Sequence, residues 1–226
     1  MTHHQEMMFM TGEGDAWYRR NRTHIGSADL LVHLISRLSG RERMQRVCEL
    51  GCANGWRLAL LRSYFASNTV FAGIDASRDA IAEGRKQFPS LDLRQSALSQ
   101  VPHDEPFDLV IVNFVLHWID RDLLSRCIGE IDRLVKWDGY LFVGDFLPDF
   151  PMCRRYHHLP GQEVYTYKQD YAQAFLGLGF YKELNRLTYQ HAHPQSGLEG
   201  AICPVDGNDR AFLSVLHKTA QAYPNS

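Results

Sequence analysis

Short apolar runs that predict strands alternate with segments of helical periodicity over residues 46–145 of this chain. The clearest run is Leu109–Val112, in which every residue is apolar, as is typical of a strand buried on both faces of a sheet. Alternating strands and helices predict an open, doubly wound sheet that is mostly parallel and carries helices on both faces. Further strands are predicted at 47–50, 69–74, 91–94, 140–144, 182–189 and 211–218. Ligands of such sheets bind beyond the carboxyl ends of the strands.

Helix signals lie between these runs. A helix is predicted from Ser27 to Gly40, and Ser77 is the expected N-cap of a second one. Asp120 is the expected cap of a third, whose apolar spacing extends to Val135.

The segment Glu49-Leu50-Gly51-Cys52-Ala53-Asn54-Gly55 joins a predicted strand to a predicted helix, and Asp75 ends the next strand. A glycine-rich turn of this kind lets a ligand approach the backbone, and a carboxylate can accept hydrogen bonds from both hydroxyls of a ribose. The dinucleotide fingerprint would need glycines at positions 53 and 56, where the chain has Ala53 and Trp56. S-adenosylmethionine has no pyrophosphate and does not need them. The turn therefore favours S-adenosylmethionine over a dinucleotide or a purely structural turn.

Four motifs occur in order: Val47–Gly55, Gly73-Ile74-Asp75, Phe107–Asn113 and Trp137–Leu141. On these motifs, residues 46–146 resemble the core of class I S-adenosylmethionine-dependent methyltransferases. The resemblance implies a Rossmann-like, seven-stranded sheet whose last strand is antiparallel. The chain departs from the family pattern at Ala53 and at Ser96, where many members have an acidic residue.

The cofactor contacts expected from the turn and the resemblance come from the strand ends: Glu49, Gly51, Cys52, Gly55, Asp75, Ala76, Ser96, Ala97 and Asn113. Trp17 and Arg20 belong to an aromatic and basic cluster near the N-terminus. They are predicted either to close the cofactor pocket or to form an ordinary helix face.

A narrower resemblance rests on Gly14–Asn21, Tyr156–Gly161 and Tyr167–Tyr171. These segments are similar to small methyltransferases of bacterial surface-polysaccharide biosynthesis, which implies a carbohydrate or a related small acceptor.

Residues 146–171 are rich in proline and longer than a compact connection needs, which indicates a binding loop at the ligand end of the sheet. His157 and His158 in this loop are candidate general bases, although a histidine pair in a loop is more often solvated. The side chains expected to bind the acceptor are His117, Tyr156, Tyr167 and Lys168.

The charge and composition of the chain limit the kinds of molecule that it is expected to bind. Lys and Arg number 24 against 26 Asp and Glu, a net charge of −2 that argues against nucleic acid. The cysteines are scattered without a C-x-x-C pair, and His191 and His193 have no acidic neighbours in sequence, so no metal site is predicted. The longest apolar stretch, 109–119, is too short to span a membrane, and a cytoplasmic location is expected.

The sequence predicts one domain over residues 1–226: an N-terminal helical cap (1–45), a cofactor-binding core (46–145), an acceptor-side insertion (146–171) and a C-terminal helix with strands (172–226). The predicted activity is methyl transfer from S-adenosylmethionine to a small acceptor, expected to be a hydroxyl of a sugar or sugar-linked intermediate. An inactive cofactor-binding scaffold or sensor and an RNA methyltransferase are the alternatives. The sequence does not determine the oligomeric state, and a homodimer is compatible with it.

Overall fold

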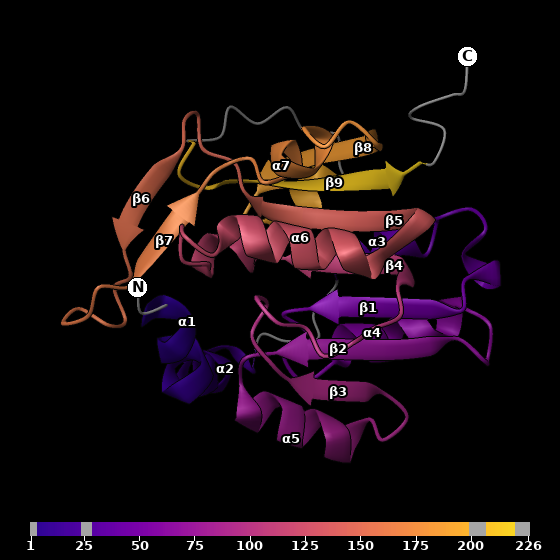
Figure 1. Cartoon of the computed structure of the whole chain (residues 1–226), viewed down its shortest axis with the longest axis horizontal. Coiled ribbons are helices and arrows are strands. Elements are labelled where there is room, and N and C mark those ends of the chain that lie inside the picture. Colours follow the sequence, from indigo (N-terminus) through magenta and orange to yellow (C-terminus); the bar gives the residue numbers. More distant parts are fainter. Residues whose placement is uncertain (1–3, 24–28, 199–206, 220–226) are drawn as a thin grey trace.

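A seven-stranded sheet forms the centre of the molecule in the computed structural model, which describes residues 4–23, 29–198 and 207–219 (Figure 1). The strand order is β3-β2-β1-β4-β5-β9-β8; β9 is antiparallel to both its neighbours and the remaining strand pairs are parallel. The strands are β1 (Arg46–Leu50), β2 (Val70–Asp75), β3 (Asp92–Gln95), β4 (Phe107–Asn113), β5 (Val135–Phe146), β8 (Tyr181–Gln190) and β9 (Arg210–Lys218). This topology confirms the predicted Rossmann-like sheet with an antiparallel last strand.

Both faces of the sheet are covered by helices, as predicted. Leu109 and Ile111 of β4 belong to one apolar cluster, whereas Val110 and Val112 belong to the other, because successive side chains of a strand point to opposite faces. The first cluster is completed by α3 (Leu30–Ile35), α4 (Trp56–Leu61) and α5 (Arg78–Gln87), and the second by α6 (Leu124–Leu134) and α7 (Ala172–Leu176). Single 3₁₀ turns lie at Arg41–Arg43, Arg62–Tyr64, Leu116–Trp118 (η4) and Pro194–Gly197.

The N-terminal segment is helical through most of its length. Helix α1 (His4–Met8), a π-helical turn η1 (Phe9–Glu13) and α2 (Gly14–Asn21) follow one another directly, with a kink at Gly12 where the backbone leaves helical geometry. Figure 1 shows these helices beyond the carboxyl ends of β1, β2 and β3.

Three predicted helix boundaries can be compared with the structure. Ser77 caps α5 as predicted, since its Oγ accepts from Ala80 N at 3.0 Å. The Asp120 prediction is wrong: its carboxylate accepts from the backbone N–H groups of Gln5 and Glu6 in α1, at 3.2 and 2.8 Å, while α6 begins at Leu124. Val135 was predicted as helical and instead starts β5, paired with Phe107. Ser27 lies outside the described residues, and Asp29 caps α3 through Val32 N.

Residues 146–171 contain a β-hairpin where the sequence predicted a loop. Strands β6 (Met152–Arg155) and β7 (Tyr165–Lys168) pair antiparallel, apart from the main sheet. The hairpin lies beside the N-terminal helices in Figure 1. Gln5 fixes this arrangement: its Nε2 donates to Tyr165 O at 2.8 Å, and its Oε1 accepts from Tyr165 N at 2.8 Å.

Of the helices in the described part of the chain, none combines the length and the apolar character needed to cross a membrane.

Two helical glycines provide a paired test of this packing. A Cβ added to Gly84 of α5 would lie 2.2 Å from Asn54 O, whereas one added to Gly129 of α6 would have nothing within 4 Å. Alanine relieves the helical penalty of glycine by roughly 0.5–1 kcal/mol, whereas overpacking costs about 1–3 kcal/mol. We expect Gly84→Ala to lower the free energy of unfolding measured in urea and Gly129→Ala to raise it. Equal shifts in the same direction would contradict this packing of α5 against the 51–55 turn.

Candidate functional site

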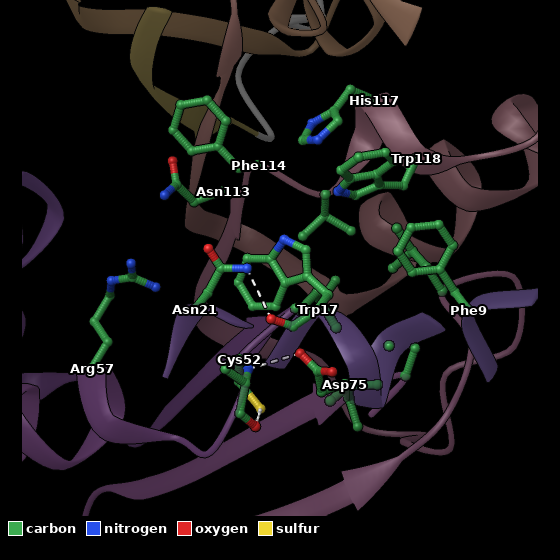
Figure 2. Close-up of a pocket in the computed structure, with 18 of the residues that line it drawn as sticks. Phe9, Trp17, Asn21, Cys52, Arg57, Asp75, Asn113, Phe114, His117 and Trp118 are labelled. Atoms are coloured by element: carbon green, nitrogen blue, oxygen red, sulfur yellow. Dashed lines mark hydrogen bonds between the residues drawn. The ribbon is translucent and has the colours of Figure 1, made fainter. Parts of the chain in front are cut away.

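A cavity of about 580 Å³ opens at the carboxyl ends of β1, β2 and β4. This volume lies within the roughly 300–1,000 Å³ typical of small-molecule sites. In Figure 2, Cys52 and Asp75 lie at one end, His117 and Phe114 at the other, and Trp17 between them. The cavity therefore extends from the glycine-rich turn after β1 to the segment that follows β4.

The turn after β1 has no room for a side chain at its first position. Gly51 has φ +80°, and a Cβ there would lie 2.2 Å from Val115 Cγ2. The N–H groups of Gly51 and Cys52 donate to Ile74 O at 2.7 and 3.0 Å, which fixes the turn against β2. Cys52 is buried in the cavity wall, and burial raises the pKa of its thiol well above the usual value.

Asp75 ends β2 and faces the cavity. Its Oδ2 accepts from Ala53 N at 2.7 Å and its Oδ1 accepts from Ser77 N at 2.8 Å. Burial raises the pKa of the Asp75 carboxyl, and these backbone hydrogen bonds oppose that rise. Because each carboxylate oxygen offers two acceptor positions, both oxygens keep the capacity to bind a ligand hydroxyl.

Eight of the predicted cofactor residues line this cavity: Trp17, Gly51, Cys52, Asp75, Ala76, Ser96, Ala97 and Asn113. Three others lie outside its wall. Gly55 adopts φ +79° as the N-cap of α4 and packs towards Leu91 and Leu93, where a Cβ would be 2.9–3.0 Å from their methyl groups. Glu49 makes a buried ion pair with Arg57, and Arg20 pairs with the buried carboxylate of Glu13.

Glu49 lies behind the turn and pairs with Arg57, which also donates to Asp29 at 2.9 and 3.1 Å. Burial raises the pKa of Glu49 to about 7, and the positive charge of Arg57 acts in the opposite direction. Arg57 and Asp29 both line the cavity, and the sequence analysis missed them. The signal was Glu49 itself, because a carboxylate on a buried strand requires a partner.

Arg20 and Tyr156 form a network with Glu13 instead of lining the cavity. Arg20 Nη2 donates to Tyr156 OH at 2.8 Å and to Glu13 Oε1, and Tyr156 OH donates to the same carboxylate at 2.6 Å. Burial raises the pKa of the Tyr156 hydroxyl above its usual range. The network joins the N-terminal helices to the β6–β7 hairpin.

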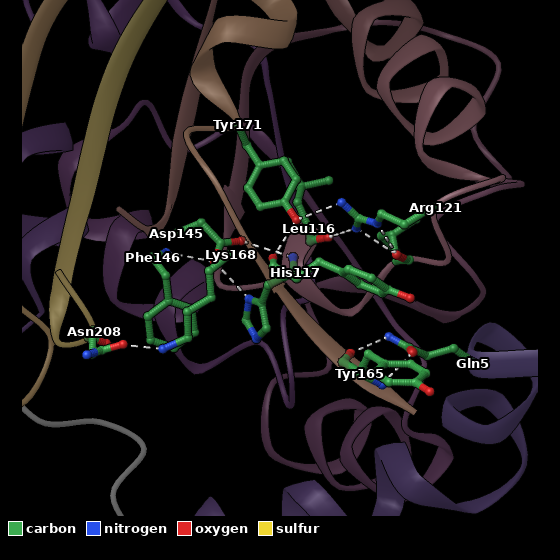
Figure 3. A network of polar contacts seen from close by, with 12 residues as sticks. Gln5, Leu116, His117, Arg121, Asp145, Phe146, Tyr165, Lys168, Tyr171 and Asn208 are labelled. Atoms are coloured by element: carbon green, nitrogen blue, oxygen red, sulfur yellow. Dashed lines mark hydrogen bonds and ion pairs between the residues drawn. The ribbon is translucent and has the colours of Figure 1, made fainter. Parts of the chain in front are cut away.

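His117 is the predicted acceptor residue that lines the cavity, and it is hydrogen-bonded to Asp145 at the end of β5 (Figure 3). The imidazole Nδ1 lies 2.8 Å from Asp145 Oδ1, and the His117 backbone N–H donates to Oδ2 at 3.2 Å. Asp145 is fully buried. The sequence analysis missed Asp145, although β4 and β5 were both predicted and neighbouring parallel strands end side by side.

The remaining predicted acceptor residues lie elsewhere. Tyr167 has the Arg121 guanidinium 4.1 Å from its ring centroid, and Lys168 donates to Asn208 O at 3.1 Å. His157 and His158 are exposed, with ring centroids 3.9 Å apart. The cavity wall contains none of these four side chains. A catalytic role for the two histidines stays a prediction that their exposed position does not favour.

Aromatic side chains that the predicted site did not include surround His117. The cavity wall here contains Phe9, Phe114, Trp118, Phe146 and His191. The described ranges hold no group of three or more His, Cys, Asp or Glu side chains placed to bind a metal ion.

Comparisons with known proteins agree with this geometry. The family model of the methyltransferase domain matches residues 18–184. Trans-aconitate 2-methyltransferase of Methylobacterium nodulans is 31% identical over 195 residues, which cover 78% of this chain and 73% of that protein.

Solved structures share the fold. The N-methyltransferase NodS of Bradyrhizobium japonicum, in complex with S-adenosyl-L-homocysteine, superposes with a TM-score of 0.58 at 16% identity, covering 94% of this chain and 96% of NodS. A Haloferax volcanii methyltransferase, solved in complex with the Trm112 activator, superposes with a TM-score of 0.65 at 17% identity. The superposition covers 92% of this chain and 96% of that one. The family match, the relative and the sheet confirm the resemblance found in the sequence: the chain belongs to the methyltransferase-domain family and is a class I S-adenosylmethionine-dependent methyltransferase.

Proposed function

We propose that this enzyme methylates a hydroxyl group of a small, uncharged acceptor, with a sugar or sugar-linked intermediate as the expected class. The observation that carries the proposal is one cavity with two chemically different ends: a glycine turn with a carboxylate at one, and a histidine among aromatic rings at the other. The first end suits the cofactor and the second suits the acceptor.

At the cofactor end, Asp75 is proposed to accept hydrogen bonds from the ribose hydroxyls, while Ser96 and Ala97 flank the adenine. S-adenosylmethionine, when bound, supplies an electrophilic methyl group on a sulfonium. The positive charge of the sulfonium is complementary to the acidic side chains of Asp29 and Asp75 in the cavity wall. Asn113 Oδ1 has no hydrogen-bond partner within the described residues, so it is a suitable acceptor for the amino group of the methionine portion.

The charge of the cavity argues for an uncharged acceptor. Across the described lining residues, Arg57 is the single Lys or Arg, and it already pairs with Glu49 and Asp29. A polyanionic acceptor would need unpaired cations or free N–H donors to replace its hydration. Although one relative is named for trans-aconitate, this wall offers little to bind such an anion.

The aromatic rings at the acceptor end offer flat apolar surfaces. Phe114 and Phe146 lie with ring centroids 5.2 Å apart, and Trp118 lies 5.1 Å from Phe9. Rings arranged in this way can pack on the apolar face of a sugar or of an aromatic acceptor, with few polar groups left to orient it.

Asp75→Asn tests the cofactor end. Loss of the charged hydrogen bonds to the ribose should cost about 1.5–3 kcal/mol, or roughly tenfold to a hundredfold in the dissociation constant of S-adenosylhomocysteine. Isothermal titration calorimetry measures this dissociation constant. Asp79→Asn is the matched control, because Asp79 lies half-buried on α5, pairs with Arg19 and does not line the cavity. Equal affinities of the two variants would show that the ribose binds elsewhere.

A panel of acceptors tests the other end. With methyl-labelled S-adenosylmethionine, we expect label to enter uncharged glycosides or phenols as an ether that resists mild alkali. Carboxylates such as trans-aconitate and RNA are the contrasting arms of the panel. Label released by mild alkali, which identifies a methyl ester, or label in RNA would contradict the proposed acceptor class.

A further inference from the structure

We infer that His117 is the general base of the transfer and that the buried carboxylate of Asp145 holds its imidazole in the active orientation. This inference rests on the proposed hydroxyl acceptor, because a hydroxyl must lose its proton during methylation. It replaces the base that the sequence placed at His157 or His158.

His117 is placed where a base is needed. It belongs to the η4 turn directly after β4 and is only 3% exposed, yet its side chain lines the cavity. Figure 2 shows the imidazole at the end of the cavity opposite Asp75, near Phe114 and Trp118. The Trp118 ring centroid lies 4.4 Å from that of His117 and the Phe146 centroid 5.0 Å, so these aromatic rings shield the imidazole from water.

Asp145 determines which nitrogen of the ring carries the proton. The carboxylate receives three hydrogen bonds: from His117 Nδ1 at 2.8 Å, from the His117 backbone N–H at 3.2 Å and from Phe146 N at 2.8 Å. An ionised carboxylate only accepts, so Nδ1 of the neutral ring must be the protonated nitrogen. The lone pair then lies on Nε2, which is the tautomer of a base oriented by a carboxylate.

The turn that carries His117 is itself fixed from behind. Arg121 donates to Leu116 O at 3.1 Å and to Ile119 O at 2.6 Å, on either side of the histidine. The same guanidinium donates to Tyr171 OH at 3.1 Å, and Tyr171 OH donates to Tyr167 O at 2.6 Å in the hairpin (Figure 3). A rigid support of this kind keeps a catalytic side chain within the narrow tolerance that proton transfer needs.

The second histidine of the wall differs in its surroundings. The His191 ring packs against Phe114 and Phe146, with centroids 4.7 and 4.9 Å away. The buried carboxylate of Asp145 is hydrogen-bonded to His117, and it is this pairing that assigns the base to His117.

Proton transfer to His117 accompanies the transfer of the methyl group. Nε2 of His117 takes the proton of the acceptor hydroxyl while the new O–C bond forms and the C–S bond of the sulfonium breaks. The C–S electron pair stays on sulfur, which becomes a neutral thioether. The imidazolium, stabilised by Asp145, later gives its proton to water.

His117→Gln tests the catalytic role. General-base help is worth about 10²–10⁴-fold, so kcat for the best hydroxyl acceptor of the labelled panel should fall by at least about a hundredfold. The dissociation constant of S-adenosylhomocysteine should stay within twofold of the unmodified enzyme. His217→Gln is the control, since His217 lies 4.0 Å from Asp138 in another His–Asp pair, away from the cavity wall, and should keep full turnover. Full turnover in His117→Gln would overturn the inference.

An acceptor-free measurement keeps the inference testable even if a variant fails to fold. In the ¹⁵N-histidine-labelled enzyme saturated with S-adenosylhomocysteine, NMR should show His117 protonated on Nδ1 at neutral pH. In Asp145→Asn we expect a mixture of tautomers and a lower kcat with unchanged cofactor affinity. A proton on Nε2 in the unmodified enzyme would overturn the inference. Cofactor binding without transfer to any hydroxyl would overturn the proposed acceptor first, and the base with it.

Discussion

The carboxylate of Asp75 joins the carboxyl ends of β1 and β2, and the shape of the cofactor end depends on that junction. Its two oxygens accept from Ala53 N and Ser77 N, so one side chain holds both the turn after β1 and the start of α5. The N-terminal helices meet the same point, because Asp15 in α2 accepts from Ser77 Oγ at 2.7 Å. Cofactor wall, crossover helix and N-terminal helices are thus assembled around one short segment.

The sequence was sufficient for the sheet because its signals are local. Strands buried on both faces need uninterrupted apolar runs, and Leu109–Val112 is such a run whatever it packs against. The N-terminal helices and the β6–β7 hairpin depend instead on contacts between residues far apart in sequence. Asp120 looks like a local helix cap, yet it binds α1 more than a hundred positions away. No local pattern contains that information.

The contrast between local sequence signals and long-range contacts also applies to the two ends of the cavity. Cofactor-end residues such as Gly51 and Asp75 follow strand ends directly, so the topology alone brings them together. For the acceptor end, the histidine pair is predicted from its place in a long loop at the ligand end of the sheet, and the sequence does not show on which face of that loop the pair lies. The pair that the structure brings together, His117 and Asp145, lies at the carboxyl ends of β4 and β5, two neighbouring strands whose register places Asn113 opposite Gly144.

Methyl transfer is an in-line displacement, so the two ends must keep a fixed distance and direction relative to each other. They are linked by main-chain hydrogen bonds across adjacent strands: β2 to β1, β1 to β4 through Leu50 and Val112, and β4 to β5. Asp75 and the proposed base are therefore carried by one continuous piece of parallel sheet. The N-terminal helices contribute Phe9 and Trp17 to the cavity wall from outside that piece.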